Sequence, residues 1–473
     1  MILHRDQLAG LAVVMLGSFV AALDASIVAT VMPTVIGELG GIDRYALVFS
    51  MYLLVSTVAT PVAGRLADVL GRTPIYVGAM VVFVAGSVGA GLSADMTQLI
   101  VARAVQGLGA GALLPVGMTI VGDLFDARGR ARVQPVFSTM WLSGALVGPV
   151  AGGLLTQTVS WRWAFLVNVP IGAAAVAVLL FVYHEHREGL DERIDWLGAA
   201  VLTIASGGLL FALNGLAPAA GALAALVGYP LFVIVERASA EPLFDLALVR
   251  NAAVGAGMAL NAIVGVMAFA VSTYLPPFVQ GVLGRTPVEA GAVVFATSVG
   301  WSSGAVVNAF VLEHLGPRRT ALCGTLCWAI GSALFVSFDA GTVLPFAVLA
   351  TATFGLGMGL TAFPVVVASQ SAVGSSRRGV VTSVVQFANN MGASIGVAAL
   401  GAVLLASLDG NARAVQAVLD RSQRAALDPA TESTLAATLD TGVHSVYLIM
   451  VGLSVVGALL AHRLPAALAD APE

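Results

Sequence analysis

Residues 8–33 read LAGLAVVMLGSFVAALDASIVATVMP, an apolar run that contains a single carboxylic acid, Asp24. A helix of this length, at about 1.5 Å per residue, can cross a hydrocarbon layer about 30 Å thick. A charged side chain inside that layer costs roughly 2.5–3.5 kcal/mol, so it is expected to face a protein interior or a water-filled cavity and to have a partner. We therefore interpret Asp24 as a functional acid, with a helix end that frays into the lipid headgroups as the alternative.

The composition of the whole chain agrees with a membrane environment. Of the 473 residues, 58% are hydrophobic and 10% are charged, whereas about 25% of the residues in soluble domains are charged. The first apolar run is much longer than the core of a signal peptide, so we expect it to be retained as a helix. The net charge of −4 gives no support for a nucleic-acid partner, which requires a basic surface.

All 22 basic residues are arginine, and the chain contains no lysine. An ATP-binding phosphate loop requires a lysine, so a pump driven by ATP within this chain is excluded, as is Schiff-base chemistry. Uphill transport would therefore use an ion gradient. The two cysteines, Cys323 and Cys327, are expected to be small buried packing residues, and we expect no disulfide, metal site or cofactor.

Fourteen apolar runs are long enough to span a membrane, and short polar or Gly/Pro-marked segments separate them. Most arginines of the connecting segments fall on the side of the N-terminus, so the positive-inside rule places both termini in the cytoplasm. We predict an all-α polytopic membrane protein with fourteen transmembrane helices. The predicted spans are 8–32, 45–66, 74–93, 97–122, 131–155, 163–183, 196–214, 217–235, 252–279, 288–312, 317–338, 341–371, 379–406 and 443–463.

Two parts of the chain repeat the same pattern. GLGAGALLP at 107–115 recurs as GLGMGLTAFP at 355–364, and GALVG at 144–148 recurs as GASIG at 392–396, each after 248 residues. Parallel halves of this kind hold a substrate site near the middle of the membrane. A chance match between glycine-rich helices is the alternative.

The repeat predicts two pseudo-symmetric six-helix bundles separated by two inserted helices. The first bundle is expected at 1–187, the inserted helices with their linkers at 188–250, and the second bundle at 251–473. A polar outer loop at 408–441 is expected to be partly helical.

A second deep charge accompanies the first. Arg103 lies about 9 Å from the outer end of its predicted helix, a depth similar to that of Asp24. Burial disfavours the charged form of an acid and an arginine neighbour favours it, so such a pair makes a proton switch. A static structural ion pair is the alternative.

Glycine-rich segments mark two further places. GRLADVLGRTP at 64–74 is expected as a turn at the cytoplasmic face, and SGALVGPVAGG at 143–153 is expected to allow close helix packing and a proline bend. The residues that we single out in them are Gly64, Asp68, Gly71, Arg72, Gly144, Gly148, Pro149, Gly152 and Gly153.

Polar and aromatic side chains at membrane depth are candidates for lining a substrate cavity, with simple helix packing as the alternative. They are Gln106, Trp141, Asn261, Trp301, Gln386 and Asn389.

Five segments, taken in order, resemble the major facilitator superfamily, specifically its fourteen-helix drug:proton antiporter branch: LDASIVATVMP, GRLADVLGRTP, RAVQGLGAG, GALVGPVAGG and WRWAFLVNVPIG. The resemblance implies that Asp24 is the acid of the first helix and Arg103 the proton-coupling arginine. It also implies a cytoplasmic gating loop at 64–73 and an antiporter helix at 144–153. Val69 and Thr73 depart from the basic residues usual in that loop.

We therefore expect a bacterial inner-membrane transporter that exports amphipathic, drug-like molecules in exchange for protons and thereby contributes to multidrug efflux and antibiotic resistance. The expected cargo is neutral or monovalent, because the tenth predicted helix carries no acid within the membrane, where some relatives that export divalent cations have one. A proton-coupled importer, or an exporter of a lipid or secreted metabolite, is the alternative. An enzyme is disfavoured, because no catalytic constellation lies at membrane depth. A passive channel is disfavoured, because the asymmetric pair of Asp24 and Arg103 gives no obvious pore. Its partners are expected to be the small-molecule substrate, protons and the bilayer, and the protein is expected to be a monomer.

Overall fold

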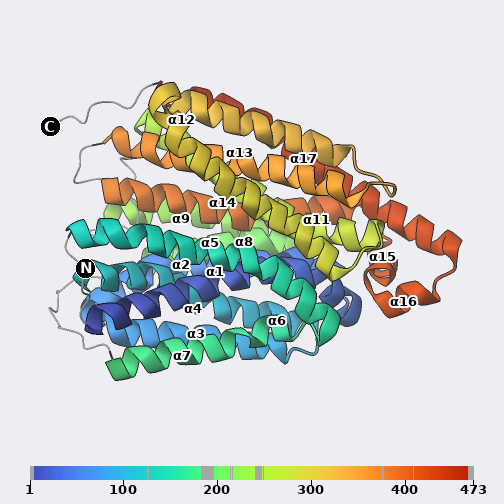
Figure 1. Cartoon of the computed structure of the whole chain (residues 1–473), viewed down its shortest axis with the longest axis horizontal. Coiled ribbons are helices and arrows are strands. Elements are labelled where there is room, and N and C mark those ends of the chain that lie inside the picture. Colours follow the sequence, from blue (N-terminus) through green and yellow to red (C-terminus); the bar gives the residue numbers. More distant parts are fainter. Residues whose placement is uncertain are drawn as a thin grey trace. The chain divides into compact units, whose positions relative to one another are not determined.

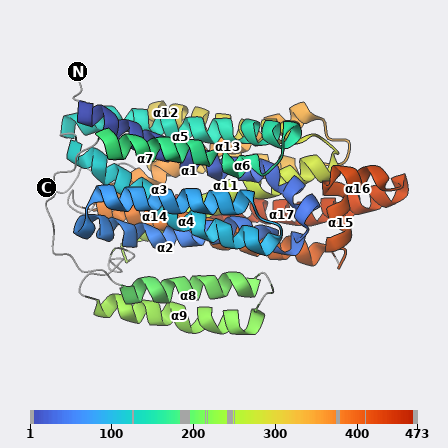
Figure 2. The same cartoon turned by 90° about the horizontal axis from the view of Figure 1, so that it is seen from below.

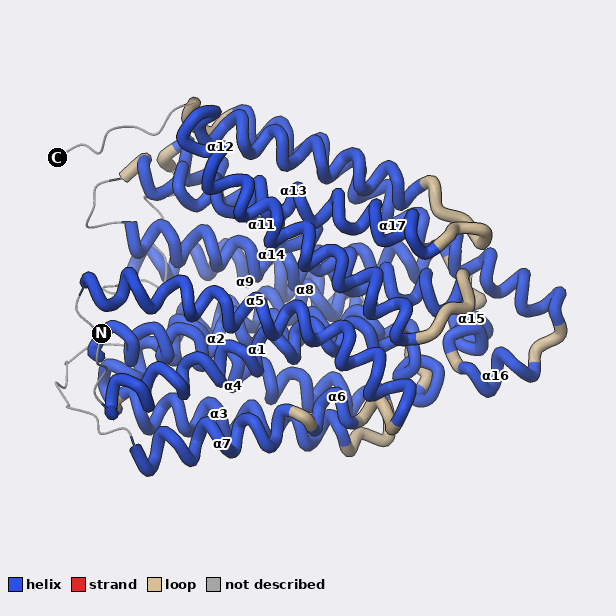
Figure 3. The backbone as a smooth tube through the Cα atoms, in the orientation of Figure 1, coloured by secondary structure: helices blue, strands red, loops and turns tan. Residues whose placement is uncertain are grey.

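The computed structural model describes residues 5–124, 127–182, 196–213, 215, 217–239, 248, 250–373, 378–408 and 410–466. Within these residues every regular element is helical (Figure 3). Twelve helices of the described part are long and apolar enough to cross a membrane. The chain is therefore an all-helical, multi-pass membrane protein.

The helices follow one another along the chain with short connections, as Figure 1 shows. Their bounds are α1 Arg5–Leu39, η1 Ile42–Arg44, α2 Tyr45–Leu70, α3 Arg72–Gly91, α4 Met96–Leu124, α5 Ala127–Thr158, α6 Trp163–Leu166, α7 Asn168–Val182, α8 Trp196–Leu213, α9 Pro218–Ala238, α11 Ala252–Pro277, η2 Phe278–Val282, α12 Pro287–Val336, α13 Leu344–Ser371, α14 Arg378–Ser407, α15 Ala412–Leu419, α16 Arg421–Ala426 and α17 Pro429–His462.

The chain forms two compact units. The first contains Met1–Val31, Leu47–Leu209 and Ala219–Leu243, and the second contains Met32–Ala46, Leu210–Pro218 and Phe244–Glu473. In the first unit α8 and α9 lie side by side (Figure 2). Their approach is close, since a Cβ added to Gly228 in α9 would lie 2.6 Å from the Cβ of Ala205 in α8.

Glycines set the packing in the first unit. A Cβ on Gly107 would lie 2.5 Å from the carbonyl oxygen of Tyr52 in α2, and one on Gly109 would lie 2.5 Å from the backbone nitrogen of Phe83 in α3. Both distances are shorter than real contacts, so α4 can lie this close to α2 and α3 only with glycine at these positions.

The second unit repeats this packing 248 residues later. A Cβ added to Gly355 would lie 2.1 Å from the carbonyl oxygen of Thr297 in the first part of α12, and one added to Gly357 would lie 2.5 Å from that of Gly324 in the second part. The repeat in the sequence thus corresponds to a repeat of contacts, in which α13 takes the place of α4.

The turn expected at 64–74 is shorter than predicted. The helix α2 extends to Leu70 and α3 begins at Arg72, so Gly71, with φ 99°, is the one residue between them. Asp68 and Arg72 are therefore helical positions. At the related place Gly316, with φ 74°, breaks α12 into two helices. A left-handed backbone is available to glycine at little cost, which explains a one-residue reversal.

The cysteines differ from expectation in their environment. Cys323 is exposed and Cys327 is half-buried, and both are free thiols. They alternate with Ala321, Gly324 and Trp328, which face inward. The expectation that both are buried packing residues was wrong, because an apolar helix that faces lipid offers small residues an outer side as well as an inner one.

The segment 408–441, which was expected as an outer loop, is partly helical in its described residues, as expected, and it is docked against α1 and η2. It contains α15, α16 and the first turns of α17. A Cβ on Gly37 in α1 would lie 2.8 Å from the Cα of Asp420, and Gln423 Nε2 donates to the carbonyl oxygen of Gly37 at 3.3 Å. Arg424 donates to Glu432 Oε1 at 2.7 Å and to the carbonyl oxygen of Gln280 at 2.9 Å. We call this segment the outer clasp.

Candidate functional site

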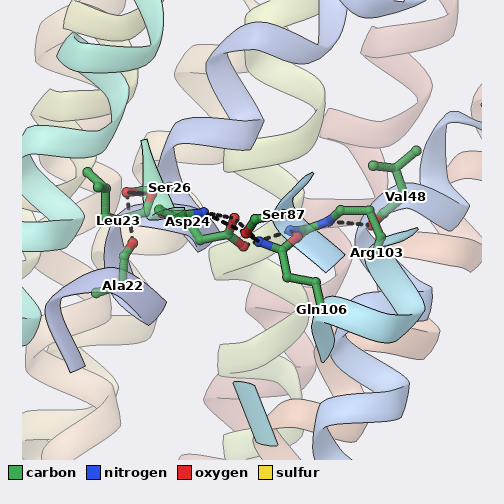
Figure 4. A network of polar contacts seen from close by, with 9 residues as sticks. Ala22, Leu23, Asp24, Ser26, Val48, Ser87, Arg103 and Gln106 are labelled. Carbon is green, nitrogen blue, oxygen red and sulfur yellow. Dashed lines mark hydrogen bonds and ion pairs between the residues drawn. The ribbon is translucent and has the colours of Figure 1, made fainter. Parts of the chain in front are cut away.

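Asp24 lies in α1 with no exposed surface, and three side chains donate to its carboxylate (Figure 4). Arg103 Nη1 lies 2.6 Å from Oδ2. Gln106 Nε2 lies 2.6 Å from Oδ1, and Asn168 Nδ2 lies 3.0 Å from the same atom. A carboxylate is an acceptor only, so this arrangement satisfies its charged form.

Arg103 is held in place from several sides. Its Nη1 also donates to Gln106 Oε1 at 2.5 Å, and its Nε donates to the carbonyl oxygen of Val48 in α2 at 3.4 Å. The guanidinium lies over the ring of Tyr52, 4.0 Å from its centroid, and 6.0 Å from that of Phe165. Aromatic faces attract a desolvated cation, which offsets part of its burial.

Ser87 completes the cluster from α3. Its Oγ accepts from Gln106 Nε2 at 2.8 Å and from Asn168 Nδ2 at 3.2 Å. Asn168 is the first residue of α7 and is fully buried. We call Asp24, Arg103, Gln106, Ser87 and Asn168 the polar cluster.

The close approach of the helices makes the polar cluster possible. A Cβ on Gly86 would lie 2.5 Å from the backbone nitrogen of Gln106, so α3 and α4 touch where their polar side chains meet. On the other side of α1, a Cβ on Gly144 would lie 2.6 Å from the carbonyl oxygen of Phe19, and one on Gly148 would lie 1.9 Å from Ser26 Oγ. Small residues thus fix α1 between α4 and α5.

The ion pair in the polar cluster is not a strong source of net stability. Two buried charges gain mutual attraction but lose their hydration, and such pairs often contribute little net stability. Loss of one partner leaves an uncompensated charge, which costs roughly 3–5 kcal/mol. The pair therefore responds strongly to any change in the charge of Asp24.

The sequence predicted three members of the polar cluster and missed two. Asp24, Arg103 and Gln106 are brought together, although Gln106 was expected in a cavity. Ser87 and Asn168 were not singled out. The available signal was an isolated polar residue in an apolar run, VAGSVGA for Ser87 and FLVNVPI for Asn168.

The other cavity candidates lie in different places. Asn261 is buried and donates to the carbonyl oxygen of Val385 at 2.9 Å, and Asn389 donates to that of Asn261 at 3.0 Å, so both join α11 to α14. Gln386 is exposed, and its Nε2 donates to Asn390 Oδ1 at 3.2 Å. Trp301 in α12 is 38% exposed. The side chain of Trp141 lies outside the described residues.

The remaining predicted residues lie in α2 and α5. Gly64 lies in α2, where an added Cβ would have no atom within 4 Å. A Cβ added to Gly152 would lie 2.9 Å from Cγ1 of Ile27 in α1. Pro149 and Gly153 lie in α5. The side chain of Asp68 lies outside the described residues.

The second unit does not repeat the polar cluster. At 248 residues beyond Arg103 and Gln106 stand Thr351 and Phe354. Thr351 donates to the carbonyl oxygen of Ala347 in its own helix, and Phe354 packs on Phe335 at 5.6 Å between ring centroids. The two halves share their packing, whereas this charged cluster belongs to the first half.

Known proteins resemble the chain over most of its length. The multidrug transporter protein MdtP of Bacillus subtilis (strain 168) is 31% identical over 395 residues, which are 82% of this chain and 73% of that protein. Multidrug resistance protein 3 of the same organism is 29% identical over 398 residues, 82% of this chain and 78% of that protein.

Solved structures show the same fold at low identity. A bacterial homologue of the human lysosomal transporter Spinster has a TM-score of 0.69 and 17% identity, with 97% of this chain and 96% of that chain covered. A D-xylose–proton symporter has a TM-score of 0.64 and 15% identity, with 98% of each chain covered.

The family model described as Major Facilitator Superfamily matches residues 14–397 and, in a second match, residues 257–471. Its members are transporters, so the chain is a membrane transporter and not an enzyme. With this match, the packing repeat and the transporter relatives in view, the chain belongs to the major facilitator superfamily.

Proposed function

We propose that this transporter exports amphipathic, drug-like molecules, neutral or monovalent cationic, in exchange for protons. The observation that carries the proposal is the buried carboxylate of Asp24, which receives three donors from α4 and α7. Asp24 is the proton-binding group and Arg103 is its counter-charge. Protonation of Asp24 removes the attraction to Arg103, and loss of the proton restores it.

The driving force is sufficient for uphill export. Each proton that enters supplies about 2.3 kcal/mol per 100 mV of membrane potential and about 1.4 kcal/mol per pH unit. Proton entry drives cargo export only if the transporter cannot change its conformation when the substrate site is empty and Asp24 is ionised. A buried acid that must be neutralised before the conformation changes meets this requirement.

The cargo class rests on two observations. Relatives that match most of the chain are named a multidrug transporter protein and a multidrug resistance protein. The described Asp, Glu and Arg residues of α12 lie in its first turn, at Glu289, and beside its break at Gly316, at Glu313, Arg318 and Arg319. Trp301, Gln386 and Asn389 are the proposed cavity residues of the second unit. Export of such compounds would contribute to antibiotic resistance.

The proposed topology has fourteen transmembrane helices with both termini in the cytoplasm of a bacterial cell and the protein acting as a monomer. Two features support a larger number than twelve. The helix α12 has 50 residues and breaks at Gly316. The helix α5 has 32 residues and is not among the twelve spans. In this topology α8 and α9 are inserted between two six-helix bundles, Gly64–Arg72 forms the inner gate, and the glycines of α5 mark it as the antiporter helix.

The test is transport in everted membrane vesicles, in which the former cytoplasmic face is outside. With an acidic lumen, vesicles that contain the protein are expected to accumulate a fluorescent monovalent cationic dye and to release protons as they do so. A protonophore should abolish both signals. Proton-coupled release of dye from the lumen would instead identify an importer. If a lipid or a secreted metabolite is accumulated and dyes are not, the cargo class is wrong.

A further inference from the structure

Two amides donate to the same oxygen of Asp24, but only one of them is locked. Gln106 Oε1 accepts from Arg103 Nη1 at 2.5 Å. Turning this amide over would place its NH₂ group against the guanidinium, which has no acceptor. Gln106 is therefore fixed in one orientation by its neighbour on α4.

Asn168 has no such lock. Its Nδ2 donates to Asp24 Oδ1 at 3.0 Å and to Ser87 Oγ at 3.2 Å. Its Oδ1 is buried and has no hydrogen-bond partner among the residues that the structure describes. A buried amide oxygen without a donor costs roughly 1–3 kcal/mol and calls for an explanation.

We propose that Asn168 is a positioning residue for the proton on Asp24 and that its amide turns over each time Asp24 changes protonation. This inference rests on the proposed role of Asp24 as the proton-binding group. With the carboxylate, Nδ2 donates to Asp24 and to Ser87, as observed. With the carboxylic acid, the amide has made a half-turn, and Asn168 Oδ1 accepts from the hydroxyls of Asp24 and Ser87. Asn168 thus makes two hydrogen bonds in each state.

Of the three described side chains that bond to Asp24, only Asn168 has a carbonyl oxygen without a partner among the described residues, because Arg103 only donates and Gln106 Oε1 already accepts from Arg103. Among the described residues, the charged or titratable groups near it are Arg103 from α4, which donates only, and Tyr52 from α2, whose ring lies against Arg103. Towards α1, α5 presents Gly144 and Gly148. The Ser87 hydroxyl can rotate, so it can donate as readily as it now accepts.

The switch uses no chemistry beyond proton transfer. One O–H bond forms on Asp24 when a proton arrives from water on one side of the membrane, and the same bond breaks when the proton leaves. The amide exchanges hydrogen bonds only. Its half-turn gives the acid a partner in both states, which prevents the protonated form from being left unsatisfied in the protein interior.

The test is infrared difference spectroscopy of the purified, full-length transporter as pH is changed, with asparagine side-chain carbonyls labelled with ¹³C. The wild type is expected to show a carboxylic C=O band that is absent in Asp24→Asn. In the wild type, this carboxylic band should appear at the same pH as a shift in the band of one labelled amide carbonyl. That amide band should vanish in Asn168→Leu, and in the smaller variant Asn168→Ala where the leucine variant does not fold.

The same variants give a second readout. Asn168→Leu removes a charge-assisted hydrogen bond from the carboxylate and a weaker, neutral one from the acid. The protonated form is therefore favoured, and the midpoint of proton release should rise by about one pH unit. Asn308→Leu is the matched control, because Asn308 is also buried with an unpartnered Oδ1 but lies in α12. It should leave both the amide band and the midpoint unchanged.

Three outcomes separate the inference from the function on which it rests. An amide band that depends on Asn168 and titrates with the acid supports the switch. An acid band that titrates with no such amide band overturns the switch and leaves Asp24 as the proton-binding group. If no carboxylic band depends on Asp24 at any pH, the proton-coupled function is wrong and the switch is wrong with it.

Discussion

Arg103 and Gln106 lie three positions apart on α4, and each donates to a different oxygen of Asp24, with both distances at 2.6 Å. The two donors are also bonded to each other at 2.5 Å. A single turn of one helix therefore supplies a charge and a neutral donor to the same acid. This arrangement makes separate predictions for each residue.

Asp24→Asn should abolish proton-coupled export while the protein remains folded in the membrane, because the amide keeps the size of the side chain but cannot titrate. Asp24→Glu should retain part of the activity. Dye accumulation in vesicles with an acidic lumen is the measurement. Asp440→Asn is the control, since Asp440 pairs with His444 in α17 at 3.1 Å and should leave coupling in place. Full uphill export by Asp24→Asn would refute the proposed role.

Arg103→Ala should leave the buried carboxylate of Asp24 without its counter-charge, which favours the neutral, protonated form of the side chain over the charged one. Substrate-induced proton release from detergent-solubilised protein should shrink or move to higher pH. Arg103→Lys should rescue only part of the effect, because an ammonium group lacks the planar fork of the guanidinium.

A double-mutant comparison decides whether Arg103 acts through Asp24. In an Asp24→Asn background, the further change Arg103→Ala should have no additional effect on proton release. An equal effect in both backgrounds would mean that the two residues are not coupled.

Gln106→Leu should weaken coupling less than the loss of either charge. The substitution removes one hydrogen bond to the carboxylate, an interaction worth roughly 1.5–3 kcal/mol when one partner is charged. The proton-release midpoint should therefore rise by about one to two pH units. An apolar side chain at this place is compatible with the fold, because Phe354 occupies the equivalent position of the second unit. An unchanged midpoint would show that Gln106 only packs.

Gly144→Ala should lower thermal stability in detergent, because the added Cβ would lie 2.6 Å from the carbonyl oxygen of Phe19. Overpacking of this kind costs about 1–3 kcal/mol. If the packing repeat is real, Gly392→Ala should cost a similar amount, since its Cβ would lie 2.3 Å from the carbonyl oxygen of Ala262. Gly78→Ala, where no atom lies within 4 Å, is the matched control and should be neutral or stabilising.

Asp428 caps α17 by accepting hydrogen bonds from Ala430 and Thr431 backbone nitrogens. Hydrogen bonds from Thr431, side chain and backbone, lower the pKa of its carboxyl group. A lowered folded-state pKa gives stability that is present above the unfolded pKa, about 3.9, and lost as pH falls through the folded one. The protection factors of the backbone amides in the first turn of α17, measured by hydrogen exchange against the intrinsic rate at each pH, should therefore fall at acidic pH. Asp428→Asn should keep the cap and remove this pH dependence.

The sequence reveals charges at membrane depth more readily than neutral partners. Asp24 and Arg103 stand out because ionised groups are rare in apolar runs, whereas Ser87 and Asn168 do not. Ser18, for example, donates to the Val14 carbonyl oxygen of its own helix, and this ordinary use of a serine cannot be distinguished from that of Ser87 without knowing which helices touch.

Helix boundaries were the weaker part of the sequence prediction. The segment GRLADVLGRTP contains two glycines and three charged residues, which are typical of a turn. Of the two glycines in this segment, Gly71 has a positive φ and interrupts the helix, whereas Gly64 has a helical backbone and lies inside α2. The packing repeat was predictable from the spacing of the glycines, since those residues are required wherever two helices touch.

The outer clasp gives access to the mechanism from the outside. Through Gly37 it holds the end of α1, the same helix that carries Asp24. With both termini in the cytoplasm, as proposed, this segment lies on the outer side of the membrane that the transporter spans. An antibody fragment or peptide that binds α15 and α16 would thus restrict the movement of α1, the helix of Asp24, without crossing the membrane. An inhibitor of this kind would act without entering the substrate site, so the transporter could not carry it as cargo.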